Sequence, residues 1–104
     1  MLGRKDDEIN YGGVKIAPEE IEGQVHKHPA IADCACIPIK DELTGQAPKL
    51  FIALKKNAEY DAREFRSFLK TALDANKQPK VIEIIDEIPR TFNGKIQRKK
   101  LMES

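Results

Sequence analysis

The residue in this sequence best placed to do chemistry is a lysine in a glycine turn near the C-terminus. Lys95 follows Asn93-Gly94, and no Asp or Glu occurs between Ile88 and Met102. An Asn-Gly pair favours the positive φ angles of a turn, so we expect the domain to present Lys95 at a turn tip. Such a cation can bind phosphate or stabilise negative charge that develops on oxygen. The alternative is a solvated lysine in a basic tail.

A second candidate site lies near the N-terminus, in residues 3–7 and 12–15, which read Gly-Arg-Lys-Asp-Asp and Gly-Gly-Val-Lys. The guanidinium of Arg4 could contact a phosphate or a ribose. Gly12 and Gly13 would allow a ligand to approach the backbone closely. A charged chain end followed by an ordinary hairpin explains the same residues, and the pattern alone leaves both interpretations open.

The histidines and cysteines do not form a catalytic or metal-binding pattern. His26 and His28 are two residues apart on a predicted helix, where such side chains do not share a face, so we expect two surface histidines and no metal site. Cys34 and Cys36 on a strand would point the same way, and a disulfide between them would be strained. Reduced thiols favour a cytoplasmic protein, and the start of the chain carries no apolar signal peptide.

Length and composition indicate one small domain. The chain has 104 residues, of which 40 % are hydrophobic and 34 % charged, enough for a modest core and a polar surface. No apolar run approaches the roughly 20 residues that a membrane span requires. The basic residues near the C-terminus could bind a nucleic acid, but a single aromatic residue among them offers no series of stacking surfaces, which argues against that partner. These basic residues are Arg90, Lys95, Arg98, Lys99 and Lys100.

The first elements that must position these residues are a hairpin and a helix. Residues 8–16 predict a short β-hairpin that turns at its two adjacent glycines. Pro18 suits the first position of a helix, and the acidic residues after it suit the positive end. Ile21 and Val25 form a narrow apolar stripe on this helix, and His28-Pro29 ends it.

Two strands and a loop follow. Residues 31–39 predict a strand, and Pro38 indicates that the end of this strand lies at an edge of the sheet or is unpaired. Residues 40–48 are expected to form a loop, and residues 49–56 a central strand because both of its faces are apolar. Alternation in the first strand separates two sets of side chains. These sets are Ala35, Ile37 and Ile39 on one face and Cys34 and Cys36 on the other.

The helix predicted over residues 62–74 has the clearest signals. Asp61 is a favourable N-cap, and Glu64 falls three residues later, as in a capping box. Tyr60 and Phe65 are spaced for a hydrophobic staple. The apolar residues of this helix recur at the spacing of one buried face.

The remaining elements complete an α+β domain. Residues 81–85 predict a third strand, residues 90–95 a turn, and residues 96–102 a short helix. The order is ββαββαβα. We expect a two-layer domain in which helices pack on a small three-stranded sheet, preceded by the short β-hairpin, with strand directions left open.

The two candidate sites together resemble one family. Residues 3–9 and 13–22 resemble the motif that opens the C-terminal domain of adenylate-forming enzymes, which include acyl-CoA synthetases, adenylation domains of non-ribosomal peptide synthetases, and luciferases. Residues 89–98, Pro-Arg-Thr-Phe-Asn-Gly-Lys-Ile-Gln-Arg, resemble the last motif of this family, which bears its catalytic lysine. The resemblance covers nearly the whole chain, and residues 13–22 are most similar to those of acyl- or aryl-CoA ligases.

The resemblance implies a two-step reaction that uses ATP with Mg²⁺ and coenzyme A. A carboxylic acid attacks the α-phosphate of MgATP and gives an acyl-adenylate and pyrophosphate. A thiol, of coenzyme A or alternatively of a carrier protein, then displaces AMP. A large N-terminal adenylation domain, absent from this sequence, would bind these molecules mainly by itself or together with the present domain, which would be a mobile lid.

The resemblance also assigns roles by position in the motifs. Lysine at position 15 stands where arginine is common, and it lacks the bidentate fork of arginine. The implied roles are catalysis of adenylation for Lys95, the hinge for Asp6, nucleotide binding for Arg4 and Lys15, and the passage of the pantetheine arm of coenzyme A for Gly12 and Gly13.

We therefore expect residues 1–104 to form one C-terminal lid domain that is inactive by itself. Its expected parts are a hinge motif at 3–7, a hairpin at 8–16, a core at 18–88 and a catalytic-lysine motif at 89–98. A different class of function is a structural interaction domain that docks on an acidic partner through the basic residues at positions 98–100.

Overall fold

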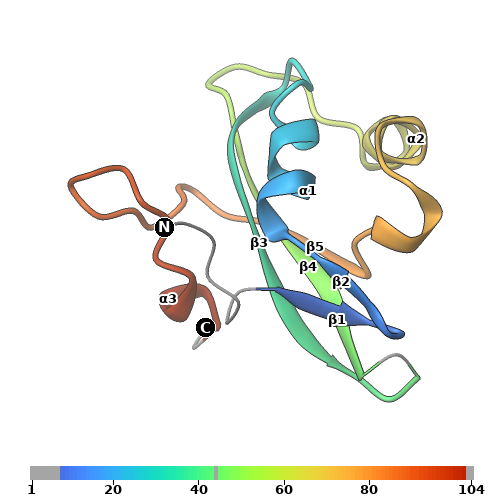
Figure 1. The fold of residues 1–104 in the computed structure, drawn as a ribbon. Helices are drawn as coiled ribbons and strands as arrows, with labels where there is room; N and C mark the ends of the chain where they lie inside the picture. Colours follow the sequence, from blue (N-terminus) through green and yellow to red (C-terminus); the bar gives the residue numbers. More distant parts are fainter. Residues whose placement is uncertain (1–7, 44, 103–104) are drawn as a thin grey trace.

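The computed structural model describes residues 8–43 and 45–102, and Figure 1 shows the arrangement of their helices and strands. The predicted order of elements, ββαββαβα, is confirmed. None of the helices in these two ranges has the length and the apolar composition that a membrane span requires. The elements are β1 (Ile9–Tyr11), β2 (Val14–Ile16), α1 (Pro18–Val25), β3 (Ile31–Asp41), β4 (Gly45–Leu54), α2 (Ala62–Ala72), the 3-10 helix η2 (Ala75–Lys77), β5 (Val81–Ile84) and α3 (Arg98–Met102).

The strands form a single mixed sheet in which β4 is central, as the sequence predicts. β4 pairs antiparallel with β3 and with β1, and parallel with β5. β3 lies at an edge of the sheet, which is one of the two alternatives that Pro38 predicts, and Pro38 itself pairs with Pro48. The hairpin joins the sheet where Tyr11 pairs with Gly45, so it continues the sheet rather than preceding it. The predicted α+β class, with helices packed on a small sheet, is confirmed, but the sheet has five strands rather than three because the hairpin strands join it.

Each face of the sheet has its own apolar core. Figure 1 shows α1 and α2 on one side of the sheet and α3 on the other. Cys34 and Cys36 face the first core, together with Phe65 of α2. The second core lies under α3 and the segment before it, and the face alternation predicted for β3 is confirmed. This second core contains Ala35, Ile37, Phe51, Ala53, Ile88 and Leu101, with Ile39, Ile85 and Ile96 at its margin.

The loop predicted over residues 40–48 is wrong, because most of these residues extend the two neighbouring strands. β3 continues to Asp41, and β4 begins at Gly45 rather than at Lys49. Gly45 has a φ angle of 89°, which lets the chain turn back and pair in register. The polar composition of this segment favours a loop, but antiparallel pairing across the turn satisfies its backbone groups.

The expectation of two surface histidines holds for His26 and is wrong for His28, whose exposed fraction is 4 %. α1 ends at Val25, so His28 is not on the helix, and helical spacing does not determine its direction. The His28 ring contacts Phe65 and Phe68 edge-on, with ring centroids 5.3 Å and 4.9 Å away.

α2 begins as predicted, with one difference in its capping. The side chain of Asp61 accepts the Arg63 amide at 2.9 Å, and the rings of Tyr60 and Phe65 lie 5.8 Å apart, which confirms the N-cap and the hydrophobic staple. The prediction of a capping box is wrong, because the carboxylate of Glu64 accepts a hydrogen bond from the His28 ring instead of from the backbone amide of Asp61. The helix ends at Ala72, two residues before the predicted end.

Candidate functional site

Lys95 lies in a tight turn whose backbone is held by several hydrogen bonds. Arg90 and Ile96 form an antiparallel bridge at the base of the turn. Above it, the Thr91 amide donates to the Lys95 carbonyl at 2.8 Å, and the Gly94 amide donates to the Thr91 carbonyl at 2.8 Å. Gly94 has a φ angle of 90°, so the turn predicted at residues 90–95 is confirmed.

The side chain of Lys95 is exposed, as the sequence predicts. Within residues 8–43 and 45–102, its ammonium takes part in no hydrogen bond or ion pair. Its backbone amide donates to the hydroxyl of Thr91 at 3.2 Å. The turn therefore holds the backbone of Lys95 in place and leaves the cation available to an external anion.

Arg90 joins the base of this turn to the start of β3. Its guanidinium donates to both carboxylate oxygens of Asp33, at 2.8 Å and 2.7 Å. Burial opposes ionisation of Asp33, but hydrogen bonds from Arg90 and from the Cys34 amide outweigh it and lower the pKa of the carboxyl. The same hydrogen bond raises the pKa of Arg90. Both groups are therefore charged at neutral pH.

Arg98 holds the C-terminal side of the turn against the sheet through a buried carboxylate. It donates to Glu22 at 2.8 Å and to the Cys36 carbonyl at 3.1 Å. The same Glu22 oxygen accepts the Cys36 amide at 2.7 Å, so both backbone groups of this edge-strand residue are satisfied. Burial raises the pKa of Glu22, and the Cys36 amide and Arg98 act against that rise.

These two arginine contacts were not found by sequence reasoning, which treats the basic residues of this segment as free of acidic neighbours. Arg90 and Arg98 are each paired with an acidic residue distant in sequence. One signal was available, because Glu22 shares the buried face of α1 with Ile21 and Val25 at helical spacing. Nothing in the local sequence marks Asp33 in this way.

The hairpin predicted to form the second candidate site is present. Gly12 and Gly13 form its turn with φ angles of 61° and 90°, and Lys15 is exposed on β2. A Cβ at Gly13 would meet no atom within 4 Å, so within this chain its backbone conformation, not crowding, favours glycine. Arg4 and Asp6 lie outside the described residues.

The structure does not bring the two candidate sites together. In Figure 1 the turn between β1 and β2 and the turn that precedes α3 lie at opposite sides of the domain. Gly12, Gly13 and Lys15 share the hairpin, whereas Lys95 lies on the other turn. Lys95 is therefore remote from the hairpin turn.

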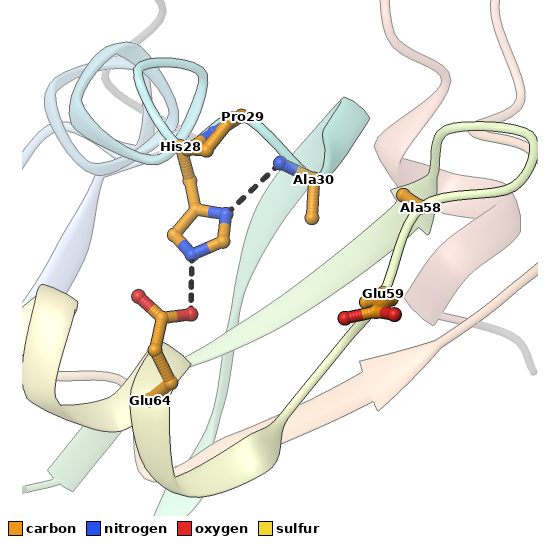
Figure 2. Close-up of a pocket in the computed structure, with 6 residues that line it drawn as sticks. All are labelled: His28, Pro29, Ala30, Ala58, Glu59 and Glu64. Atoms are coloured by element: carbon orange, nitrogen blue, oxygen red, sulfur yellow. Dashed lines mark hydrogen bonds and ion pairs between the residues drawn. The ribbon is translucent and has the colours of Figure 1, made fainter.

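A pocket of about 330 Å³ lies between the end of α1 and the start of α2 (Figure 2). His28 lines it, and both of its ring nitrogens are occupied. Nδ1 accepts the Ala30 amide at 3.1 Å, which leaves Nε2 as the protonated nitrogen that donates to Glu64 at 2.8 Å. The imidazole therefore has no nitrogen available as a general base, and no predicted site residue lines this pocket.

The cysteines are buried free thiols. Burial raises the pKa of Cys34 to about 12 and also raises the pKa of Cys36, so neither is a reactive thiolate at neutral pH. In the described part of the chain, no three His, Cys, Asp or Glu side chains gather to hold a metal ion.

Comparison with known proteins identifies the class to which this fold and this lysine turn belong. Residues 20–95 match the AMP-binding enzyme C-terminal domain family. The chain belongs to this family, which confirms the resemblance found in its motifs.

Relatives of known activity match nearly all of the chain. 4-Hydroxybutyrate–CoA ligase 1 of Metallosphaera sedula is 38 % identical over 97 % of the chain and 18 % of the relative. The vibriobactin-specific 2,3-dihydroxybenzoate-AMP ligase of Vibrio cholerae is 42 % identical over 97 % of the chain and 19 % of the relative. The chain therefore spans about a fifth of the length of the relatives that it matches.

A solved structure shows the same fold. The o-succinylbenzoate CoA synthetase of Bacillus subtilis, in complex with an acyl-adenylate intermediate, superposes with a TM-score of 0.89 at 30 % identity. The match covers 99 % of this chain and 21 % of that chain. The α+β fold described above is thus that of the C-terminal domain of adenylate-forming enzymes.

Proposed function

We propose that residues 1–104 are the mobile C-terminal domain of an AMP-forming acyl-CoA ligase, and that Lys95 is its catalytic residue for adenylation. The observation that carries this proposal is the exposed ammonium of Lys95, on a turn whose backbone is held by hydrogen bonds. Family membership and the CoA-ligase relatives support the same assignment.

Lys95 acts in the first step of the proposed reaction. A carboxylate oxygen of the acid attacks the α-phosphorus of ATP, the bond to the β-phosphate oxygen breaks, and pyrophosphate leaves with the bonding electrons. Negative charge accumulates on the oxygens around the α-phosphorus during this attack. The ammonium of Lys95 would lie against those oxygens and stabilise that charge, which is a role that a point cation performs well.

The hairpin acts in the second step. A thiolate sulfur attacks the acyl carbon, the bond from that carbon to the phosphate oxygen breaks, and AMP leaves. Gly12 and Gly13 would line the path of the pantetheine arm, and Lys15, with Arg4, would contact the nucleotide. Since the hairpin turn and the Lys95 turn lie on opposite sides of the domain, the domain must rotate between the steps, and Asp6 is the proposed hinge.

The proposed partners are a large N-terminal adenylation domain, a carboxylic acid and the thiol of coenzyme A. ATP with Mg²⁺ and coenzyme A would be bound mainly by or together with that larger domain. The two free cysteines fit a reducing compartment, and we propose the cytoplasm. The second candidate acceptor is a carrier-protein thiol, because the relative from Vibrio cholerae is named as an AMP ligase rather than a CoA ligase.

The test measures pyrophosphate release by the full-length enzyme that carries this chain, with MgATP and acetate, benzoate or octanoate as the acid. Lys95→Ala is expected to lower acid-dependent release by ~10²–10³-fold, the usual loss for one strong transition-state contact. Lys70→Ala, which removes another exposed lysine on α2, serves as the matched control and should leave the rate unchanged.

Equal pyrophosphate release by the Lys95→Ala variant and the unmodified enzyme would show that the assigned role is wrong. The 104-residue chain by itself is expected to release none. Adding coenzyme A or a carrier protein to the preformed acyl-adenylate would then distinguish the two acceptors.

A further inference from the structure

The guanidinium of Arg90 contacts both the edge of the sheet and the Lys95 turn. Two of its nitrogens donate to the two carboxylate oxygens of Asp33, at 2.8 Å and 2.7 Å. Its third nitrogen donates to the carbonyl of Gly94, the residue that directly precedes Lys95. One side chain therefore ties the edge of the sheet to the peptide group that carries the proposed catalytic lysine.

The acceptor at the other end of this connection is itself held in place. Asp33 belongs to β3, and its Oδ1 accepts the amide of Cys34 at 2.9 Å. The ring of His26 lies 3.5 Å from the same oxygen. Because Asp33 pairs with Ala53 of the central strand β4, its backbone is fixed in the sheet, and the Cys34 amide orients its carboxylate.

Apolar contacts fix both sides of the turn in the same way. Ile88 precedes the turn and Leu101 follows it, and both are buried against Ala35, Ile37 and Phe51 of the sheet. Together with the backbone hydrogen bonds inside the turn, these contacts hold its backbone against the sheet, while the side chain of Lys95 extends into solvent. The volume that its ammonium can reach is set by the position of the turn.

We infer that Arg90 is a positioning residue, which holds the Lys95 turn in the direction needed for adenylation through its contacts with Asp33 and Gly94. This inference rests on the proposed function of Lys95. A cation that must lie against a developing negative charge is sensitive to misplacement by about 1 Å, which can cost on the order of 10²-fold in rate. Only a planar fork can contact both oxygens of Asp33 and also reach the Gly94 carbonyl, so lysine cannot fully replace Arg90.

A purely structural role for the Arg90–Asp33 pair makes a different prediction. The exposed fractions of the two side chains are 32 % and 24 %, and a partly exposed ion pair adds only modestly to the stability of a fold. Removal of Arg90 should therefore leave the domain folded and change the placement of the turn. If Arg90 served only to stabilise the fold, its removal would slow adenylation and thioester formation to the same extent.

The experiment uses the full-length enzyme and measures each half-reaction separately. Adenylation is followed by pyrophosphate release at saturating MgATP and acid, and thioester formation is followed from preformed acyl-adenylate and coenzyme A. The variants are Arg90→Met, Arg90→Lys and Asp33→Asn. Lys77→Met is the matched control, because it breaks an ion pair of 2.9 Å with Glu20 that lies away from the turn.

Arg90→Met is expected to lower the adenylation rate constant by about 10- to 100-fold, with little change in the KM for ATP. Arg90→Lys and Asp33→Asn should lower the adenylation rate constant by a smaller factor, and Lys77→Met should leave it unchanged. Thioester formation should be unchanged in all of them. In a Lys95→Ala background, Arg90→Met should have no further effect on adenylation, because the two residues act as one unit.

Each contrary result has a distinct meaning. If Lys95→Ala slows adenylation but Arg90→Met does not, the inference is wrong and the proposed function stands. If Arg90→Met slows both half-reactions equally, or still slows adenylation without Lys95, Arg90 has only a structural role. If Lys95→Ala itself has no effect, the proposed function fails first. Should Arg90→Met not fold, the milder Arg90→Lys and Asp33→Asn variants decide by the same criteria.

Discussion

Glu22 and Arg98 lie 76 residues apart in the sequence and form a buried ion pair of 2.8 Å at the edge of the sheet. The exposed fractions of their side chains are 8 % and 12 %. Through Cys36, the pair also satisfies one amide and one carbonyl of the edge strand β3. It thus connects α1, the sheet and the start of α3, the helix that follows the Lys95 turn.

This geometry predicts that removing one partner lowers the free energy of unfolding strongly, whereas replacing both partners lowers it much less. Arg98→Met leaves the Glu22 carboxylate buried without its cation, and we expect a loss of about 3–5 kcal/mol in the free energy of unfolding. In the double variant with Glu22→Gln, the amide oxygen can still accept the Cys36 amide, so most of the loss should be recovered. Denaturant unfolding of the 104-residue chain measures both values.

Lys99→Met is the control for this comparison, since it removes the exposed neighbouring cation of α3 and should change stability by less than about 0.5 kcal/mol. Equal losses in the single and the double variant would contradict the account of a stranded charge.

The raised pKa of Glu22 predicts a specific pH dependence of stability. Because the folded chain binds this proton more tightly than the unfolded chain, whose pKa is near 4.5, its contribution to stability is complete below that pH. The contribution is lost as pH rises through the folded pKa. We therefore expect the Glu22→Gln variant to gain stability relative to the unmodified chain as pH rises from about 4 to 7, measured by denaturant unfolding across that range.

Asp33→Asn provides a control of opposite sign, because the folded pKa of Asp33 is lowered from 3.8. Its ionised form stabilises the fold above the unfolded pKa, and this stabilisation is lost as pH falls through the folded pKa. The deficit of Asp33→Asn should therefore shrink in acid. A Glu22→Gln difference that is independent of pH would show that burial does not govern that carboxyl.

Two glycines predict opposite effects of the same substitution. Gly23 lies on the exposed side of α1 with open space around its Cα, so Gly23→Ala should stabilise the chain by about 0.5–1 kcal/mol through helix propensity. Gly13 has a φ angle of 90° in the hairpin turn, so Gly13→Ala should destabilise it by about 1–2 kcal/mol. Thermal or denaturant unfolding of both variants tests the pair, and a stabilising Gly13→Ala would contradict the assigned turn conformation.

Local signals in the sequence were sufficient for the order of the elements and for the lysine turn. The two adjacent glycines at 12 and 13 predict the hairpin, Asp61 predicts the start of α2, and Asn93-Gly94 predicts the turn before Lys95. Each of these signals acts within a few residues, because turn angles, caps and periodicity depend on neighbouring side chains. The motifs at residues 3–22 and 89–98, taken together, were also sufficient to indicate the family.

Tertiary structure alone decided what surrounds that turn. Arg90 meets Asp33 from 57 residues away, and His28 meets Glu64 from 36 residues away. Residues 40–41 and 45–48 likewise extend β3 and β4 because two polar segments pair with each other, and neither segment predicts this pairing alone. The sequence determined by itself that a lysine would stand at a turn tip. Only the folded chain decided which carboxylates hold that turn, because ion pairs depend on distances in space that local sequence does not encode.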